Sequence, residues 1–148
     1  MKIIEVKERT PILVQELLKV WEKSVRATHL FLSDSEINSI KGYVPQALNG
    51  VANLVIAENE NGIPIAFMGV ESGILEMLFV APEERGKGIG KNLIRYGMKA
   101  YGIEKLTVNE QNPQAKGFYE YMGFKVYKRS ENDEQGNPYP LLYMSLSH

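Results

Sequence analysis

The segment between residues 85 and 91 has the residue types and spacing that most clearly suggest chemistry. It alternates glycines with basic and apolar residues and consists of Arg85, Gly86, Lys87, Gly88, Ile89, Gly90 and Lys91. Glycine allows a sharp turn and leaves no Cβ between the backbone amides and a ligand. Because a helix is expected to begin here, its free amides, its dipole and the three cations would suit a phosphate group. A flexible turn with a solvated basic face is the structural alternative.

Two common phosphate-binding motifs do not fit this segment. The Rossmann fingerprint needs G-x-G-x-x-G in a parallel β–α–β unit, whereas here the spacing is G-x-G-x-G after an expected meander of strands. The P-loop pattern G-x-x-x-x-G-K-[ST] is absent from the sequence. The segment therefore indicates an anion site of another kind.

Two other side chains are candidate proton acceptors. Glu76 is the only charged residue in the apolar run 74–80, and a carboxylate on a central strand should have a raised pKa unless it faces a cavity. An ion pair with an arginine or lysine is the structural alternative for Glu76. His29, one of two histidines in the chain, lies in the connection between two expected helices. A lone histidine also often has a structural role.

Two signatures, in the right order and at the right spacing, resemble those of the GNAT (Gcn5-related) N-acetyltransferases. Residues 85–90 (RGKGIG) match the R/Q-x-x-G-x-G/A signature, with which the family grips the pyrophosphate of acetyl-CoA. Residues 112–124 (NPQAKGFYEYMGF) are similar to the N-x-x-A-x-x-F-Y-x-x-x-G-F signature. The order of elements also agrees, so the resemblance covers essentially the whole chain. It implies transfer of an acetyl group from acetyl-CoA to a primary amine.

The resemblance also implies roles for single residues. Tyr119 would protonate the departing sulfur of CoA, and Asn112 would hydrogen-bond the pantetheine arm. Backbone groups of Leu78, Phe79 and Val80 would polarise the thioester carbonyl. The structural alternatives are a core tyrosine on an amphipathic helix, a helix N-cap, and core packing on a strand.

For the base and the acceptor the resemblance leaves alternatives open. Some family members carry a base on the strand of Glu76, and others carry a glutamate on the next strand, where this chain has Thr107. His29 lies where the family binds its acceptor, so Glu76, His29 and water all remain candidate bases. The acceptor would be a protein lysine or N-terminus; a small-molecule amine, or a CoA-binding sensor or interaction module with little catalysis, is the alternative. With no cysteine to carry an acetyl group, direct attack in a ternary complex is expected.

The periodicity of apolar residues predicts an α+β fold with a central mixed, mostly antiparallel sheet flanked by helices. Thr10-Pro11 predicts a helix start, and Ser33 with Glu36 predicts a capping box for a second helix, which Pro45 bends or ends. The expected strands are 2–7, 53–58, 63–71, 74–80, 103–109, 124–130 and 141–146, and the other expected helices are 88–101 and 113–122.

Composition limits the function classes. The chain has 148 residues with 44% hydrophobic and 24% charged residues, as one globular domain over 1–148 would have. A net charge of -1 gives no general reason to bind nucleic acid. No cysteine and only two histidines exclude thiolate and multi-histidine metal sites. With no long apolar segment, we expect a cytoplasmic protein without a membrane partner, as a monomer or homodimer.

Overall fold

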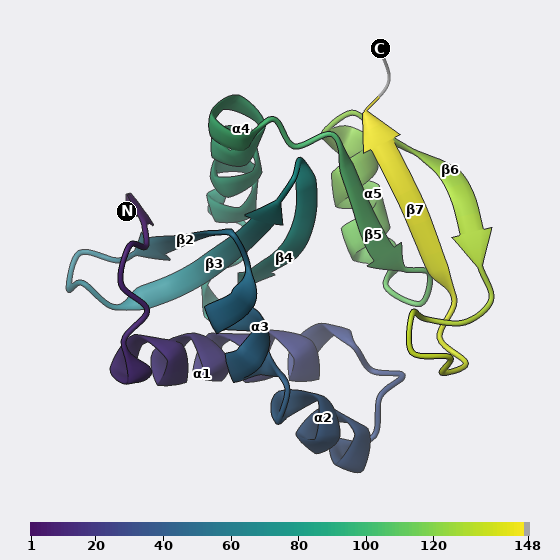
Figure 1. The fold of residues 1–148 in the computed structure, drawn as a ribbon, viewed down its shortest axis with the longest axis horizontal. Coiled ribbons are helices and arrows are strands. Elements are labelled where there is room, and N and C mark those ends of the chain that lie inside the picture. The colour runs from purple at the N-terminus through teal and green to yellow at the C-terminus, as the bar shows by residue number, and fades with distance from the viewer. Residues whose placement is uncertain (147–148) are drawn as a thin grey trace.

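A sheet of seven strands forms the centre of the structure, a computed structural model that describes residues 1–146 (Figure 1). The strand order is β1-β2-β3-β4-β5-β7-β6, and every neighbouring pair is antiparallel except β4 and β5. This arrangement confirms the mixed, mostly antiparallel sheet predicted from the sequence. The strands are β1 (Lys2–Glu5), β2 (Asn53–Glu58), β3 (Pro64–Glu71), β4 (Ile74–Val80), β5 (Lys105–Asn109), β6 (Phe124–Ser130) and β7 (Leu141–Leu146).

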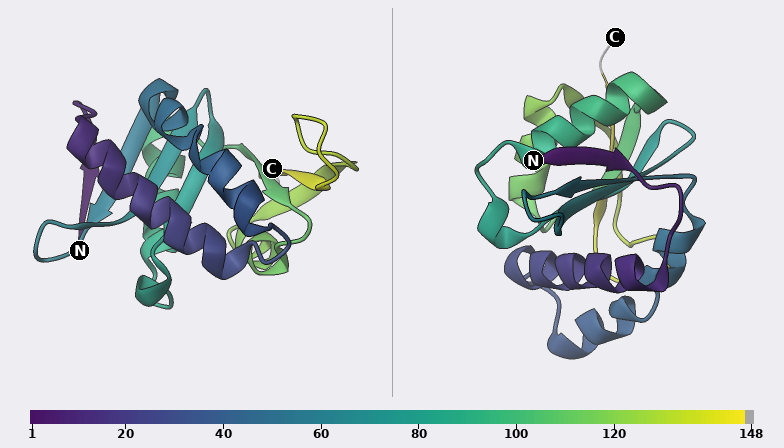
Figure 2. Two further views of the ribbon diagram at one scale, coloured as in Figure 1. Left: turned by 90° about the horizontal axis from the view of Figure 1, so that it is seen from below. Right: turned by 90° about the vertical axis from the view of Figure 1, so that its left-hand side faces the viewer.

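Helices cover the two faces of the sheet unequally. They are α1 (Pro11–Thr28), α2 (Asp34–Lys41), α3 (Val44–Gly50), the 3-10 turn η1 (Pro82–Glu84), α4 (Ile89–Tyr101) and α5 (Pro113–Tyr121). Figure 2 shows α4 and α5 on one side of the sheet and α1 to α3 on the other. Because α1 packs on β3 and β4, the face of β5, β7 and β6 opposite α5 is left more open. No helix within residues 1–146 is long and apolar enough to cross a membrane.

The core has two halves, one on each face of the sheet. Successive side chains of a strand point to opposite faces, and on β3 Phe67 and Met68 are both fully buried. Phe67 packs in the cluster beneath α1, with Leu17 and Trp21, whereas Met68 packs in the cluster beneath α4, with Leu93. Residues of β3 are therefore fixed from both sides, which gives the neighbouring strand β4 a rigid support.

Strand β4 changes its pairing part-way along. Opposite β4, Gly69 of β3 faces Met77 and the next residue of β3 faces Leu75, so Glu76 is the extra residue of a β-bulge. On the other side, β5 pairs only with the first two residues of β4. Beyond them the two strands separate, so backbone groups of residues 76–80 that point toward β5 have no strand partner. The sheet is thus open at its centre.

Local sequence signals predicted the starts of the first two helices correctly, but the prediction for Pro45 was wrong. The Thr10 side chain accepts a hydrogen bond from Leu13 N at 3.2 Å, and Ser33 and Glu36 form the predicted capping box. The expectation that Pro45 bends or ends the second helix was wrong. Helix α2 ends at Lys41, and Pro45 instead lies in the first turn of α3. Proline is tolerated there because the amide it lacks would have no helical partner.

Candidate active site

A cavity of about 470 Å³ lies where β4 and β5 separate, between α1, the turn before α4, and α5. We call it the glycine-turn cavity. Of the predicted cofactor-binding residues, it is lined by Leu78, Phe79, Val80, Arg85, Gly86, Gly88, Ile89, Gly90, Lys91 and Asn112. Tyr119 and His29 also line it. One cavity therefore brings together segments from four separate parts of the sequence.

The glycine-rich turn has a backbone that only glycine adopts easily. Gly86 and Gly88 have φ angles of 79° and 77°, in the left-handed region. A Cβ built on either glycine would have no protein atom within 4 Å, so the backbone is open toward the cavity. Helix α4 starts at Ile89, and its first amides have no helical acceptor. With Arg85 and Lys91 also on the wall, the turn fits the phosphate groups of a ligand.

Lys87 is the one predicted cofactor contact that does not line the cavity. Its Nζ lies 2.7 Å from the Oε2 of Glu84, and its side chain is 61% exposed. The ion pair holds the Lys87 charge on the outer side of the turn and neutralises a carboxylate that lines the cavity. Lys87 therefore makes the wall less negative, but it does not reach into it.

We expect Gly88→Val to weaken binding of acetyl-CoA by at least about tenfold, because its side chain would fill the space in front of the turn amides. A β-branched residue at positive φ also costs about 1–2 kcal/mol. Gly62→Val is the matched control: Gly62 has a φ of 74°, equally open surroundings and no contact with the cavity. Calorimetry should show reduced affinity for Gly88→Val alone; equal affinities in both folded variants would remove the turn from the binding site.

Tyr119 presents a free hydroxyl to the glycine-turn cavity. Its ring, on α5, packs at 5.3 Å from the Phe118 ring and at 6.3 Å, edge-on, from the Phe124 ring. Within residues 1–146 the hydroxyl has no hydrogen-bond partner, although the ring lines the cavity. Burial raises the pKa of the Tyr119 phenol well above its ordinary value. The hydroxyl therefore remains protonated and can donate to a group in the cavity.

Asn112 combines a structural contact with a free polar group. Its Oδ1 accepts a hydrogen bond from Ala115 N at 3.3 Å, which caps α5. Its side-chain NH₂ has no partner within the described residues 1–146 and lies on the cavity wall. An amide donor at this position can hydrogen-bond a carbonyl oxygen of a bound ligand. Both interpretations of Asn112 from the sequence are thus compatible with the structure.

His29 is held as a neutral ring with one nitrogen available. Thr28 Oγ1 donates to the Ser24 carbonyl at 2.8 Å and also lies 2.8 Å from His29 Nδ1. Since its only proton is already used, Thr28 must accept from Nδ1–H, which leaves Nε2 as an unprotonated acceptor. Burial and the nearby charge of Arg85 lower the pKa of His29. The structure thus favours a base or hydrogen-bond acceptor over a cation.

A row of aromatic rings joins His29 to a distant loop. The centroids of His29 and Phe31 are 5.4 Å apart, and those of Phe31 and Tyr139 are 5.5 Å apart. The connection between α1 and α2 therefore touches the loop 131–140 between β6 and β7. Neither segment carries a sequence signal for this contact.

Glu76 lies in a second cavity, of about 600 Å³, on the open face of β5 and β7. We call it the open-face cavity. Its carboxylates are Glu76, Asp133 and Glu134, and Lys105 also lines it. Within residues 1–146, Glu76 has no ion pair or hydrogen bond, contrary to the structural alternative considered from the sequence. Burial, followed by the charges of Glu134 and Glu71, raises the pKa of the Glu76 carboxyl.

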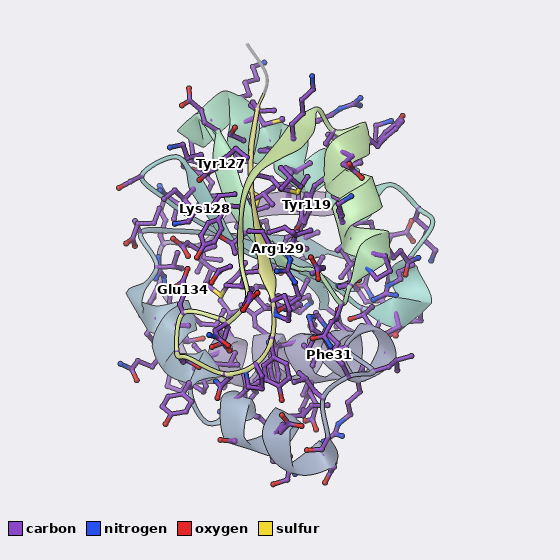
Figure 3. All side chains as sticks on the ribbon, turned by 90° about the vertical axis from the view of Figure 1, so that its right-hand side faces the viewer. Phe31, Tyr119, Tyr127, Lys128, Arg129 and Glu134 are labelled. Carbon is purple, nitrogen blue, oxygen red and sulfur yellow. The ribbon has the colours of Figure 1, made fainter. Side chains whose placement is uncertain are left out.

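The two cavities lie on successive parts of β4. Residues 74–76 line the open-face cavity, and residues 78–80 line the glycine-turn cavity. Figure 3 shows Tyr119 on the α5 side of the sheet and Glu134 on the opposite side. Two molecules could therefore approach the same stretch of β4 from different directions. Thr107, which stands where some family members carry a glutamate, also lines the open-face cavity.

Several residues of the site had no signal in the sequence. Ser24 and Thr28 belong to the apolar face of α1, and Tyr121 is an ordinary residue of an amphipathic helix. They line the glycine-turn cavity only because α1 and α5 meet the turn before α4. Asp133 and Glu134 lie in a polar loop, and only the fold places them opposite Glu76.

This chain is similar to several known proteins. A family model described as "Acetyltransferase (GNAT) domain" matches residues 50–126. The peptidyl-lysine N-acetyltransferase YjaB of Salmonella typhimurium is 41% identical over 128 residues, which cover 86% of this chain and 88% of that protein. YjaB of Escherichia coli is 39% identical over 135 residues, 88% of either protein. The solution structure of its apo form superposes with a TM-score of 0.86 at 38% identity, over 98% of this chain and 97% of that one.

Proposed function

The chain belongs to the GNAT acetyltransferase family, and from that premise we propose that it acetylates lysine side chains of proteins. It is an N-acetyltransferase whose donor is acetyl-CoA. The relatives named above, YjaB of two bacteria, are peptidyl-lysine N-acetyltransferases. This similarity supports lysine as the acceptor, and the carboxylates of the open-face cavity suit an amine acceptor.

In this proposal the glycine-turn cavity holds the donor. The amides at the start of α4, with Arg85 and Lys91, bind its pyrophosphate, and the NH₂ of Asn112 binds its pantetheine arm. A backbone N–H of β4 among residues 78–80 without a strand partner donates to the thioester oxygen. The residues present thus supply a donor for each negatively charged or polar part of acetyl-CoA.

The single observation that carries the proposal is the pair of cavities on successive parts of β4. The open-face cavity contains three carboxylates and one lysine, so its charge attracts a protonated amine. Glu76, the extra residue of the bulge, lines the open-face cavity, and the glycine-turn cavity begins two residues further along β4. An amine that enters from the open face would meet the thioester where β4 and β5 separate, and the two substrates would react directly.

The proton and electron balance of that reaction can be assigned to named groups. The neutral amine attacks the thioester carbon, a C–N bond forms, and the C–S bond breaks. The proton lost by the amine goes to Glu76, to Nε2 of His29, or to water. Tyr119 gives its proton to the departing sulfur and recovers one from solvent. No acetyl-enzyme is needed, and the chain has no cysteine to form a thioester.

We expect protein lysines to be better acceptors than small amines. The test uses an N-terminally blocked peptide with one lysine flanked by arginines, the same peptide with norleucine in place of lysine, spermidine, and an aminoglycoside. Release of free thiol from acetyl-CoA gives kcat/KM, and mass spectrometry locates the acetyl group. Acetylation of the lysine peptide, with a higher kcat/KM than for the small amines, is the expected result.

The other outcomes identify the alternatives. Turnover with spermidine or the aminoglycoside but not with the lysine peptide would make the protein a small-molecule acetyltransferase. Binding of acetyl-CoA without thiol release from any acceptor would indicate a CoA-binding module. Residues of a single chain line both cavities, so the proposed reaction can proceed in either a monomer or a homodimer.

A further inference from the structure

One residue, Glu110, binds both ends of the loop 131–140, which joins β6 to β7. At the first end, Arg129 of β6 donates to both oxygens of the Glu110 carboxylate: its Nε lies 2.6 Å from Oε2, and its Nη2 lies 3.0 Å from Oε1. At the other end, Glu110 N donates to the Pro140 carbonyl at 2.9 Å. Because Glu110 directly follows β5, it attaches both ends of the loop to that strand.

The geometry of the Glu110–Arg129 pair distinguishes it from an ordinary surface ion pair. A single contact between exposed charges contributes little, but an arginine that binds both oxygens of a carboxylate is held in one orientation. Hydrogen bonds from Arg129 lower the pKa of the Glu110 carboxyl, whereas the pKa of Glu76 is raised. Glu110 therefore stays ionised, and the pair intact, over the pH range in which Glu76 titrates.

The loop itself has a defined shape. Asp133 Oδ1 accepts hydrogen bonds from the backbone amides of Gln135, at 3.0 Å, and of Asn137, at 2.8 Å. Glu134, within this turn, lines the open-face cavity, and Figure 3 shows Arg129 on the strand from which the loop continues. Since the loop is held together by its own hydrogen bonds, the position of Glu134 depends on how the two ends are held.

Neither Glu110 nor Arg129 lines either of the two cavities. The pair can therefore affect the reaction only through the groups that it positions. On the donor side, Asn112 is held independently, because its side chain caps α5 through Ala115 N. On the acceptor side, the loop depends on the pair at its first end. Loss of the pair should thus affect the acceptor more than the donor.

We propose that Glu110 and Arg129 are positioning residues for the acceptor: they hold the loop 131–140 against β5 and so place Glu134 at the open-face cavity. The inference rests on the proposed function, in which this cavity receives the acceptor amine. It adds a requirement for two residues that touch neither substrate.

Kinetics with the lysine peptide test the pair directly. Arg129→Gln and Glu110→Gln should each raise KM for the peptide about fivefold, with kcat within about twofold of wild type. The two variants change the net charge in opposite directions, so a long-range effect on a basic peptide cannot raise KM in both. The double variant Glu110→Arg/Arg129→Glu reverses the pair and should recover most of the wild-type KM. Calorimetry should give the same Kd for acetyl-CoA in all four proteins.

The pH profile separates positioning from a general loss of structure. The charged groups around Glu76 are Glu71 of β3, Lys105 of β5, and Asp133 and Glu134 of the loop. Only the two loop carboxylates are released when the pair is broken. In both single variants the rise of kcat/KM on the acidic side should therefore move to lower pH, as for loss of the Glu134 charge. Arg129→Gln combined with Glu134→Gln should show no larger shift than Glu134→Gln alone.

Lys116→Gln is the matched control. It removes another positive charge that acts on Glu110, but it leaves the Arg129 contact in place and lines neither cavity. Its KM should stay within about twofold of wild type.

Hydrogen exchange gives a readout that needs no acceptor. Backbone amides of residues 135–137 should exchange faster in both single variants than in wild type or the double variant. A wild-type KM, an unshifted pH profile or unchanged exchange in the single variants would overturn the positioning role. Failure of the proposed function looks different: wild type itself then leaves the lysine peptide unmodified, while the exchange pattern is still the expected one.

Discussion

Glu76→Gln is expected to lower kcat/KM for a lysine peptide by about 10²- to 10⁴-fold at neutral pH, the range of a general base. Glutamine has nearly the same shape but cannot accept the proton of the amine. The raised pKa of Glu76 brings it closer to the value that suits a base near neutral pH. Initial rates of thiol release over a range of pH measure the effect.

The pH dependence follows from the direction of that shift. Glu76 must be ionised to act, so wild-type kcat/KM should rise as pH increases through its raised pKa. Glu76→Gln should lack this limb, and its deficit should shrink toward high pH as more of the amine, with a pKa of about 10.4, deprotonates unaided. A small loss with a profile parallel to that of wild type would contradict the assignment and favour His29 or water.

Two controls separate catalysis from stability. Since the folded-state pKa of Glu76 is raised, ionisation of this group lowers stability as pH rises through that range. Glu76→Gln removes that charge and should not lower the melting temperature at neutral pH. Glu134→Gln removes the like charge that helps to raise the pKa of Glu76. In this variant the rise of kcat/KM on the acidic side of the pH profile should therefore move to lower pH. An unmoved limb in Glu134→Gln would mean that another group titrates there.

Tyr119→Phe is expected to lower kcat by about 10- to 10³-fold, at or below the usual range for a general acid. The thiolate of CoA can leave without a proton, so the loss should be partial. The affinity for acetyl-CoA should remain, because phenylalanine keeps the ring contacts with Phe118 and Phe124. Single-turnover rates report the chemical step, and calorimetry reports the binding.

Stability and pH provide the controls for this second variant. Because the Tyr119 hydroxyl has no hydrogen-bond partner within residues 1–146, its removal should leave the melting temperature nearly unchanged. With its raised pKa, Tyr119 should stay protonated beyond the ordinary phenol value of about 10. Below that pH, any fall of kcat on the alkaline side of the pH profile should therefore be the same in wild type and variant. Tyr43→Phe, at an exposed position that lines neither cavity, should turn over like wild type. Equal turnover of Tyr119→Phe and wild type would make Tyr119 a packing residue only.

The sequence by itself determined most of the elements, though not helix α3, and the local parts of the site. Caps at Thr10, Ser33 and Asn112 depend on residues three positions apart, and such contacts are encoded locally. The glycine-rich turn is local in the same sense, since positive φ at Gly86 and Gly88 requires the residue type that stands there. The family resemblance and the identity of the donor came from these same short segments.

Only the tertiary structure decided which groups meet. The bulge at Glu76 arises from the pairing of β4 with β3, and its raised pKa depends on Glu134 from a distant loop. The pKa of His29 is lowered by burial and by the charge of Arg85, and neither contribution can be predicted from the sequence. Register and electrostatic neighbours are set by contacts between segments far apart in the chain. For this reason the sequence named Glu76 and His29 as candidates, but the fold assigned them to different cavities.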